Sequence, residues 1–395
     1  MSLNRGRPLT MMPGPSVIPD RVLAAMGRPM PNIYEGELIE VSLQVLDQLP
    51  SLARTRAEAF VAISNGHGAW EMALTNTLSR GDTVLVLESG HFAAAWGDMA
   101  EVSGVRVLRL AGEARGPVDA AAVQACLQAD TAREIAAILV VHVDTASSVR
   151  NDIPAIRRAM DAADHPALLF VDCIASLGCE RFEMDAWGVD LTVAASQKGL
   201  MVPPGLGFVW AGERARLAHT RADLRTGYWD WTARSKPEVH YRRYCGTPPI
   251  SHLYGMAEAL AMLAEEGLEA VWARHGVMGD AVRAAVQAWA TPNALELNIV
   301  EPSARSNAVT TIRTGSVDAP ALRQLCEQRA GLTLGVGLSG DGTFRVGHMG
   351  HLNPPMVLGA LGTIEAALGA LDAPTAGSGV AAAAAVIAAA LRVDS

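Results

Sequence analysis

The sequence is poor in the features that mark disulfide-bonded, metal-binding and nucleic-acid-binding proteins. Its cysteines are few and scattered, with no C-x-x-C pair: Cys126, Cys173, Cys179, Cys245 and Cys326. This pattern fits reduced thiols in a cytoplasm better than a disulfide framework or a zinc site, so we expect no metal. Charged residues make up 18% of the chain, the formal net charge is -9, and no basic cluster or aromatic platform occurs. These properties argue against a nucleic-acid partner.

Long apolar runs are also missing. The segment MSLNRGRPLTMMPGPS contains two arginines but no apolar stretch of signal-peptide length. Near the other end, Val380 to Leu391 is almost entirely alanine and valine, which is too short to cross a bilayer and is typical of a packed helix. We therefore expect a cytoplasmic protein with no membrane partner.

The sequence does contain enough apolar residues for a large core. Hydrophobic residues make up 50% of the 395 positions, which allows two domains or one large domain and a smaller one. Short apolar strands alternate with helical stretches, the βαβ pattern of a mostly parallel sheet. We expect an α/β fold with an N-terminal arm over residues 1–19, a large domain over 20–255 whose mostly parallel sheet is flanked by helices, and a smaller C-terminal α+β domain over 256–395.

Apolar periodicity predicts the individual elements. The expected strands are Glu58–Ser64, Thr83–Glu88, Val105–Leu110, Ile135–Val143, Leu168–Val171, Leu191–Ala195, Gly207–Ala211, Ala308–Arg313 and Thr343–Val346. The expected helices are Asp20–Met26, Tyr34–Leu52, Ala69–Leu78, Ser251–Trp289 with a break at Gly267, Ala319–Arg329 and Pro355–Leu371. The stretch Leu9–Pro19 is rich in turn residues and is expected to be an irregular arm.

Two successive apolar strands of the predicted sheet are followed by complementary chemistry. Asp172 closes Leu168–Val171, and Lys198 follows Leu191–Ala195. Because ligands bind at the carboxyl ends of strands in open α/β sheets, this carboxylate and amine should project into one crevice. The pair suits an aldehyde cofactor, pyridoxal 5'-phosphate (PLP), which would form a Schiff base with the amine while the carboxylate holds a proton on the ring nitrogen. Taken singly, an aspartate at a strand end is more often a cap, and a lysine is more often solvated.

A glycine-rich turn, Asn65-Gly66-His67-Gly68, joins a predicted strand to a predicted helix. Such a turn leaves backbone N–H groups free at a helix N-terminus, which favours a bound anion. The alternative is an ordinary connection between a strand and a helix. The turn is neither a P-loop nor a G-x-G-x-x-G fingerprint, so nucleotide binding is not indicated.

Three further side chains are candidates for the same site. Phe92 follows a strand and could stack on a planar ring, and the hydroxyl of Thr145 could bond to a phenolic oxygen. Core packing and helix capping are the alternatives for both. Arg345 lies in an apolar strand, where an arginine is costly unless it meets an anion, so it could clamp a substrate carboxylate. An ion pair with a local acid such as Asp341 is the alternative.

Several short motifs follow one another in a consistent order along nearly the whole chain. They are P-G-P at Pro13, N-G-H-G at Asn65, V-D-C-I-A-S-L-G at Val171, S-Q-K at Ser196 followed by P-P-G, Y-x-x-T at Tyr244, E-G-L-E at Glu266 and F-R-V-G-H-M-G at Phe344. Together they resemble the class V aminotransferases of PLP fold type I, most of all the alanine–glyoxylate and serine–glyoxylate aminotransferases. The resemblance implies a PLP-dependent transaminase that moves an amino group from a small amino acid (alanine, serine or aspartate) to glyoxylate or a similar small 2-oxo acid.

The resemblance also implies a role for each candidate residue. Lys198 would carry the Schiff base and then move a proton between Cα and the cofactor carbon. The cofactor ring would lie between Phe92 and Ile174, with Asp172 on its nitrogen and Thr145 on its phenolic oxygen. The phosphate would be held by the turn of Asn65, Gly66 and His67, by Gln197, and by Tyr244 and Thr247 of the neighbouring subunit, which implies a homodimer with shared active sites. The expected substrate contacts are Gly14, Tyr34 and Arg345.

Two segments depart from the family pattern, and both flank the substrate pocket. Asn32–Glu35 reads N-I-Y-E where relatives often carry His or Arg followed by Ser or Asp, and Asp144–Ser148 reads D-T-A-S-S where many carry E-T-S-T-G. The amino donor therefore stays open. The ending R-V-G-H-M-G and the alanine-rich tail also resemble pyridoxamine–pyruvate aminotransferase, a relative without the phosphate cup. The N-G-H-G turn and Thr247 argue against that alternative.

Two other functions compete with transamination. A desulfurase or lyase of the same fold needs a mobile cysteine opposite the cofactor, and neither Cys173 in a strand end nor Cys326 in a helix is well placed for this. A catalytically inert binding protein would not need Lys198.

Overall fold

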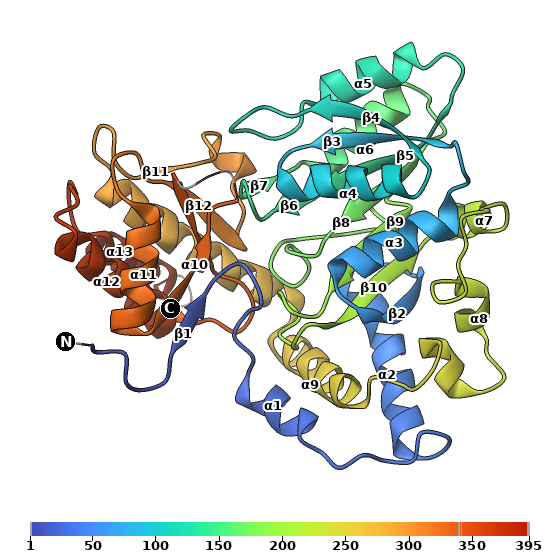
Figure 1. Cartoon of the computed structure of the whole chain (residues 1–395), viewed down its shortest axis with the longest axis horizontal. Helices are drawn as coiled ribbons and strands as arrows, with labels where there is room; N and C mark the ends of the chain where they lie inside the picture. The colour runs from blue at the N-terminus through green and yellow to red at the C-terminus, as the bar shows by residue number, and fades with distance from the viewer. Residues whose placement is uncertain (1, 339, 341, 393–395) are drawn as a thin grey trace.

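The chain folds around two β-sheets. A computed structural model describes residues 2–338, 340 and 342–392. Figure 1 shows the larger sheet among green and blue elements and the smaller sheet among orange and red ones. In spatial order, the larger sheet consists of β2 (Glu58–Ser64), β10 (Gly205–Ala211), β9 (Leu191–Ala195), β8 (Leu168–Asp172), β5 (Ile135–Val141), β3 (Thr83–Glu88) and β4 (Arg106–Ala111). Only β10 runs against its neighbours, so the larger sheet is mostly parallel, as predicted.

Both faces of the larger sheet are covered by helices. On β3, Val84 and Val86 pack into one core, whereas Leu85 and Leu87 pack into another on the opposite face. Burial on both faces explains why these strands are continuous apolar runs and do not alternate with polar residues. The helices of this half are α1 (Asp20–Met26), α2 (Glu37–Leu52), α3 (Gly66–Thr77), α4 (His91–Val102), α5 (Ala120–Ala129), α6 (Ile153–Ala162), α7 (Glu213–His219), α8 (Trp231–Ser235), the 3-10 helix η1 (His240–Tyr244) and α9 (Ile250–Glu266).

The smaller sheet has its own apolar core, built with the C-terminal helices. In spatial order it consists of β1 (Leu9–Met11), β13 (Leu332–Val336), β14 (Thr343–Gly347), β12 (Val309–Arg313) and β11 (Glu296–Leu297). The helices are α10 (Leu268–Trp289), the 3-10 helix η2 (Pro302–Ala304), α11 (Ala319–Ala330), α12 (Pro354–Ala370) and α13 (Gly379–Ala390), the last of which packs on α10. The alanine-rich tail is therefore a packed helix, as predicted. Between the two sheets lies the short hairpin of β6 (Val143–Asp144) and β7 (Val149–Arg150).

The N-terminal arm differs from the prediction. Leu9–Met11 forms β1, which pairs in parallel with Leu332–Leu334 of β13, so the arm is part of the smaller sheet. The blue arm in Figure 1 then crosses between the two halves before it reaches α1. A three-residue strand has no periodic signal of its own and forms only because β13 is already present to pair with it. The domain boundaries at residues 19 and 255 stay a prediction.

Helix boundaries differ from the prediction at two places that matter for the site. The helix expected from Tyr34 begins at Glu37, which leaves Tyr34 in the preceding loop. The helix expected from Ala69 begins at Gly66, because Asn65 caps it with its side chain. Within the described residues, no helix combines the length and apolarity that crossing a membrane requires.

Candidate active site

A cavity of about 260 Å³ opens at the carboxyl ends of the larger sheet. Open α/β sheets bind ligands at this edge. The lining residues are Asn65, Gly66, His67, Trp70, Phe92, Val141, Val143, Thr145, Asp172, Ile174, Ala175, Gln197 and Lys198. The structure thus brings together most of the cofactor contacts predicted from sequence, including the carboxylate of Asp172 and the amine of Lys198.

Asp172 ends β8 and is only 3% exposed. Its carboxylate accepts hydrogen bonds from the indole Nε1 of Trp70 (2.8 Å) and from the backbone N–H of Ile174 (2.6 Å). Burial raises the pKa of Asp172 to about 7, and the two donors and the amine of Lys198 only partly oppose this rise. Burial disfavours the ionised carboxylate of Asp172. A protonated ring nitrogen next to it would supply a positive charge that stabilises the ionised form.

Lys198 lies three residues beyond β9, in the turn that leads to Pro203 and Pro204. Its Nζ donates to the backbone carbonyl of Pro13 in the N-terminal arm. Burial lowers the pKa of Lys198 to about 8, and the nearby guanidinium of Arg345 lowers it further. An amine with this pKa is partly neutral near physiological pH, which is the form that attacks an aldehyde.

Gly14 of the arm is pressed against this lysine. Its φ is +94°, and a Cβ at this position would lie 2.5 Å from Cδ and Nζ of Lys198 and 2.6 Å from Cε. Only glycine fits such a contact, because any side chain would displace the amine. Gly14 therefore contacts the candidate catalytic residue directly, although it does not line the cavity.

The glycine-rich turn forms the N-terminus of α3, as an anion site requires, but part of its capacity is already used. The amide Oδ1 of Asn65 accepts from the backbone N–H groups of His67 (3.0 Å) and Gly68 (3.4 Å). The backbone N–H of Gly66 has no hydrogen-bond acceptor among the described residues. The carboxamide Oε1 of Gln197 is buried and likewise has no partner within the part of the chain that the structure describes. A free backbone N–H at a helix N-terminus suits a bound anion, and Gln197 could add to it only through its Nε2 donors, because Oε1 is an acceptor.

Phe92 and Thr145 are held by one buried carboxylate that the sequence analysis did not single out. The carboxylate of Asp144 accepts from the backbone N–H groups of Phe92 (2.8 Å), Ala93 (3.1 Å) and Ala146 (2.9 Å). It thus caps α4 and fixes the loop that carries Thr145. Burial raises the pKa of Asp144, and these N–H donors oppose the rise.

The sequence suggested that Arg345 binds either a substrate carboxylate or a local acid. In the structure, its guanidinium donates to backbone carbonyls. Its Nε donates to the carbonyl of Val336 (2.6 Å), and its Nη1 donates to the carbonyl of Thr145 (2.9 Å). Asp341 lies outside the described residues. Burial lowers the pKa of Arg345 to about 10, and Asp144 partly opposes this change. The side chain is 7% exposed and is not among the residues that line the cavity.

Three other predicted contacts lie away from the cavity of their own chain. Tyr244 is buried, and its hydroxyl pairs with Ser42 of α2. Thr247 is exposed. Tyr34 is 66% exposed, and its ring meets Tyr241 edge-on at 5.9 Å between centroids. The roles given to these residues concern a neighbouring subunit or a substrate and stay predictions.

Comparison with known proteins identifies the family. Residues 52–344 match the family described as Aminotransferase class-V. The chain belongs to this family. The aminotransferase is 40% identical over 391 residues to the serine–glyoxylate aminotransferase of Methylorubrum extorquens, covering 96% of this chain and 95% of that one. It is 39% identical over 391 residues to the L-aspartate–glyoxylate aminotransferase of Paracoccus denitrificans, covering 94% of each.

Solved structures agree on the fold of the aminotransferase. The crystal structure of pyridoxamine–pyruvate aminotransferase from Mesorhizobium loti superposes with a TM-score of 0.89 at 28% identity, covering 99% of this chain and 100% of that one. The aminotransferase therefore has fold type I of the PLP-dependent enzymes, and the fold class and family expected from the motifs are confirmed.

Sequence reasoning missed four residues that line the cavity of the aminotransferase. Val141, Val143 and Ala175 are small apolar residues that carry no signal of a site. Trp70 does carry one, because its indole N–H lies one helical turn beyond Gly66 on the helix that starts at the cavity. An indole N–H is usually bonded when it is buried, so this donor pointed to an acceptor in the site.

Proposed function

We propose that this aminotransferase uses PLP to transfer an amino group from a small amino acid, namely alanine, serine or aspartate, to glyoxylate or a similar small 2-oxo acid. The observation that carries the proposal is that Asp172 and Lys198 face one cavity, each with its pKa displaced toward the middle of the scale. Perturbed, complementary groups in a cleft are typical of catalytic sites. The names of the relatives support glyoxylate as the acceptor.

The residues present fit PLP. When bound, PLP supplies an aldehyde and an electron-withdrawing ring. Asp172 would hold the ring nitrogen, Phe92 and Ile174 would flank the ring, and Thr145 would hold its phenolic oxygen. The phosphate would lie on the N-terminus of α3, where Gly66 supplies a free N–H and Gln197, which lines the cavity, would donate from Nε2.

Lys198 would act twice. Its partly neutral amine would be the nucleophile that holds the cofactor aldehyde, and the same Nζ would be the group that takes up and returns the proton of the substrate Cα. The carbonyl of Pro13 and the bare Cα of Gly14 confine Nζ from the arm side. This confinement would keep the amine within reach of both atoms.

Arg345 would bind the substrate carboxylate. Nε and Nη1 donate to carbonyls, and for Nη2 the structure gives no acceptor among the described residues. A buried guanidinium without a carboxylate partner favours the binding of an anion such as the substrate carboxylate. Glyoxylate has no side chain, so a small pocket beside this guanidinium suffices.

We also propose a cytoplasmic homodimer in which Thr247 reaches the phosphate of the neighbouring site. The exposure of Thr247 supports this proposal. For Tyr244 to take the same role, its hydroxyl would have to exchange Ser42 for the neighbour's phosphate.

The alternative is a pyridoxamine–pyruvate activity, which the structural similarity to the Mesorhizobium enzyme favours. The N-G-H-G turn, with its free N–H at the N-terminus of α3, favours a cofactor that carries phosphate. Cys173, Cys179 and Cys326 do not suit a desulfurase, because all three are buried and burial raises the pKa of each thiol.

The chain offers an unusually clean test, since Lys198 and Lys236 are its only lysines. Borohydride reduction in the presence of PLP should fix the cofactor on Lys198, as located by mass spectrometry. Lys198→Ala should lose this labelling and all transamination, whereas Lys236→Ala, at an exposed position, should keep both. Mixing the wild type with single amino acids, and then with glyoxylate, pyruvate or pyridoxamine, would identify the substrates. Labelling of Lys236, or transamination by Lys198→Ala, would contradict the proposal.

A further inference from the structure

The loop Thr145–Ser148, which we call the bracket loop, accepts hydrogen bonds at four successive backbone carbonyls. The donors lie in the smaller sheet and in the segments that lead into β12. The carbonyl of Thr145 accepts from Nη1 of Arg345 (2.9 Å), and that of Ala146 accepts from Oγ1 of Thr311 (3.0 Å). The next two carbonyls accept from Asn298 Nδ2 (2.9 Å, to Ser147) and from the backbone N–H of Ser306 (3.3 Å, to Ser148). All four donors belong to the C-terminal half of the chain.

Two of these donors are direct neighbours. Thr311 of β12 and Arg345 of β14 are paired residues in the antiparallel ladder, so their side chains leave the same face of the sheet. They bond to consecutive carbonyls of the bracket loop. Both side chains are nearly inaccessible, with Thr311 2% and Arg345 7% exposed. The position of the guanidinium relative to the bracket loop is thus set by two adjacent hydrogen bonds, one from Arg345 and one from Thr311, while Nε of Arg345 is held separately by the carbonyl of Val336.

On its other side, the bracket loop is tied to the cofactor-facing half of the cavity. Asp144 directly precedes it and caps α4 through Phe92 and Ala93, and Ser147 Oγ donates to the carbonyl of Ser89 (3.0 Å). Thr145 itself lines the cavity. One short segment therefore connects the candidate ring contacts to the candidate carboxylate contact.

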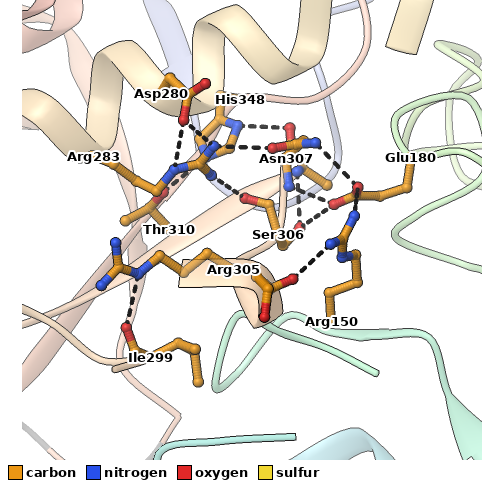
Figure 2. A network of polar contacts seen from close by, with 12 residues as sticks. Arg150, Glu180, Asp280, Arg283, Ile299, Arg305, Ser306, Asn307, Thr310 and His348 are labelled. Carbon is orange, nitrogen blue, oxygen red and sulfur yellow. Dashed lines mark hydrogen bonds and ion pairs between the residues drawn. The ribbon is translucent and has the colours of Figure 1, made fainter. Parts of the chain in front are cut away.

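A second junction keeps the two halves in register beside the bracket loop (Figure 2). The buried carboxylate of Glu180 accepts from Ser306 Oγ (3.0 Å) and from Asn307 Nδ2 (3.2 Å), and it pairs with Arg150 of β7 at 3.6 Å. Arg283 of α10 in turn donates to the carbonyl of Ser306 (2.7 Å). Because Ser306 takes part in both junctions, β12 has little freedom to slide along the loop.

We propose that Thr311 is a positioning residue for substrate binding, which acts by holding the bracket loop in the register that presents Arg345 to the substrate carboxylate. The inference rests on the proposed role of Arg345. Without the Thr311 hydroxyl, the carbonyl of Ala146 would be buried and unpaired, and the loop would shift to find another donor. Any such shift moves Thr145 and its bond to Nη1.

The test is Thr311→Val, which keeps the shape and removes the donor. We expect the KM for both the amino donor and glyoxylate to rise about tenfold, with kcat reduced less than threefold. Thr311→Ser keeps the hydroxyl and should restore KM to within about twofold of the wild type. The control is Thr333→Val on β13, whose hydroxyl bonds at the surface to Glu327, its one partner among the residues that the structure describes, and which should leave KM unchanged.

A double-mutant cycle separates positioning from simple destabilisation. In an Arg345→Ala background, Thr311→Val should change KM by less than twofold, because its effect passes through the absent guanidinium. An unchanged KM in Thr311→Val, or an equal effect with and without Arg345, would overturn the proposal. If Arg345→Ala itself leaves KM unchanged, the assigned role of Arg345 fails first, and the borohydride labelling of Lys198 decides the rest of the proposed function independently.

Discussion

Replacing Asp172 with asparagine tests the electrostatics of the site in protein prepared without cofactor. The wild-type carboxyl is 3% exposed, and burial raises its pKa to about 7, whereas an unfolded chain gives aspartate a pKa of about 3.9. Asparagine keeps the shape but cannot titrate. With a single acceptor oxygen, it also leaves either Trp70 or Ile174 without a partner, which costs roughly 1–3 kcal/mol at every pH.

The pH dependence has a definite sign. A carboxyl group whose pKa is raised by folding stabilises the native state fully below its unfolded pKa, and this contribution is lost as the pH rises through the folded pKa. A rise from about 3.9 to about 7 corresponds to about 4 kcal/mol in total, of which roughly two pKa units, or about 3 kcal/mol, are lost between pH 5 and pH 8. Without cofactor, burial thus stabilises the neutral form of Asp172 relative to the ionised form.

Buried histidines change the free energy of unfolding with pH in the opposite direction, so their contribution must be removed from the comparison. Burial lowers the pKa of His142 and His348 to about 3 and that of His275 to about 4. Their contribution to stability is present above the unfolded pKa of about 6.5 and is lost as the pH falls toward the folded values. The prediction therefore concerns the difference between the wild type and Asp172→Asn, in which the histidine contributions are common to both proteins.

The assay is urea unfolding at pH 5, 6, 7 and 8, followed by circular dichroism at one fixed protein concentration. The free energy of unfolding of the wild type minus that of Asp172→Asn should fall by about 3 kcal/mol from pH 5 to pH 8. Added PLP should flatten this dependence, since a protonated ring nitrogen lowers the pKa of the carboxyl. A difference that stays constant to within ~0.5 kcal/mol without cofactor would refute the reasoning.

Two glycines give further predictions. Gly14→Ala places a Cβ against Lys198 at a φ of +94°, so we expect kcat to fall at least about tenfold and the melting temperature to fall by an amount that corresponds to roughly 1–3 kcal/mol; steady-state kinetics and thermal unfolding measure both. Gly66→Ala would place a Cβ 2.3 Å from Cδ1 of Ile174 without a positive φ, so the fold should survive while the Kd for PLP rises about tenfold in an absorbance titration. Adding Ile174→Val removes Cδ1 and should restore the affinity; a double variant as weak as Gly66→Ala would contradict the steric explanation.

The elements that could be predicted are those whose pattern is local. β2, β3 and α1 have the predicted boundaries, because runs such as Thr83–Glu88 have a continuous apolar centre and polar residues at both ends. β1 could not be predicted, since it is defined by its partner β13 and not by its own three residues. The start of α3 depends on which atom caps it, and a run of Asn, Gly and His reads equally well as a turn until the side chain of Asn65 is seen bonded to His67.

The same distinction applies to the site. Asp172 and Lys198 could be placed together because the topology of a parallel sheet brings consecutive strand ends to one edge. Arg345 could be recognised as a buried cation in need of an acceptor, but its acceptors are the carbonyls of Thr145 and Val336, which any residue type at those positions would supply. Backbone acceptors leave no trace in composition or spacing.

The bracket loop is the part of the site that the sequence predicts least, because all of its acceptors in this junction are backbone carbonyls. Its four carbonyls would be present with almost any sequence, so the chemical information about the junction lies in the donors, which are scattered between Asn298 and Arg345. Even there, Thr310 and Thr311 look interchangeable, yet they leave opposite faces of β12, one toward His348 and the other toward Ala146. A shift of one residue in the pairing of β12 would bring Thr310 to the place of Thr311, but it would also bring Val309 opposite His348 and move Thr311 to the place of the buried Ile312. Ser306 then ties the approach to β12 both to Glu180 and to the bracket loop, and a sequence does not show that one residue makes both contacts.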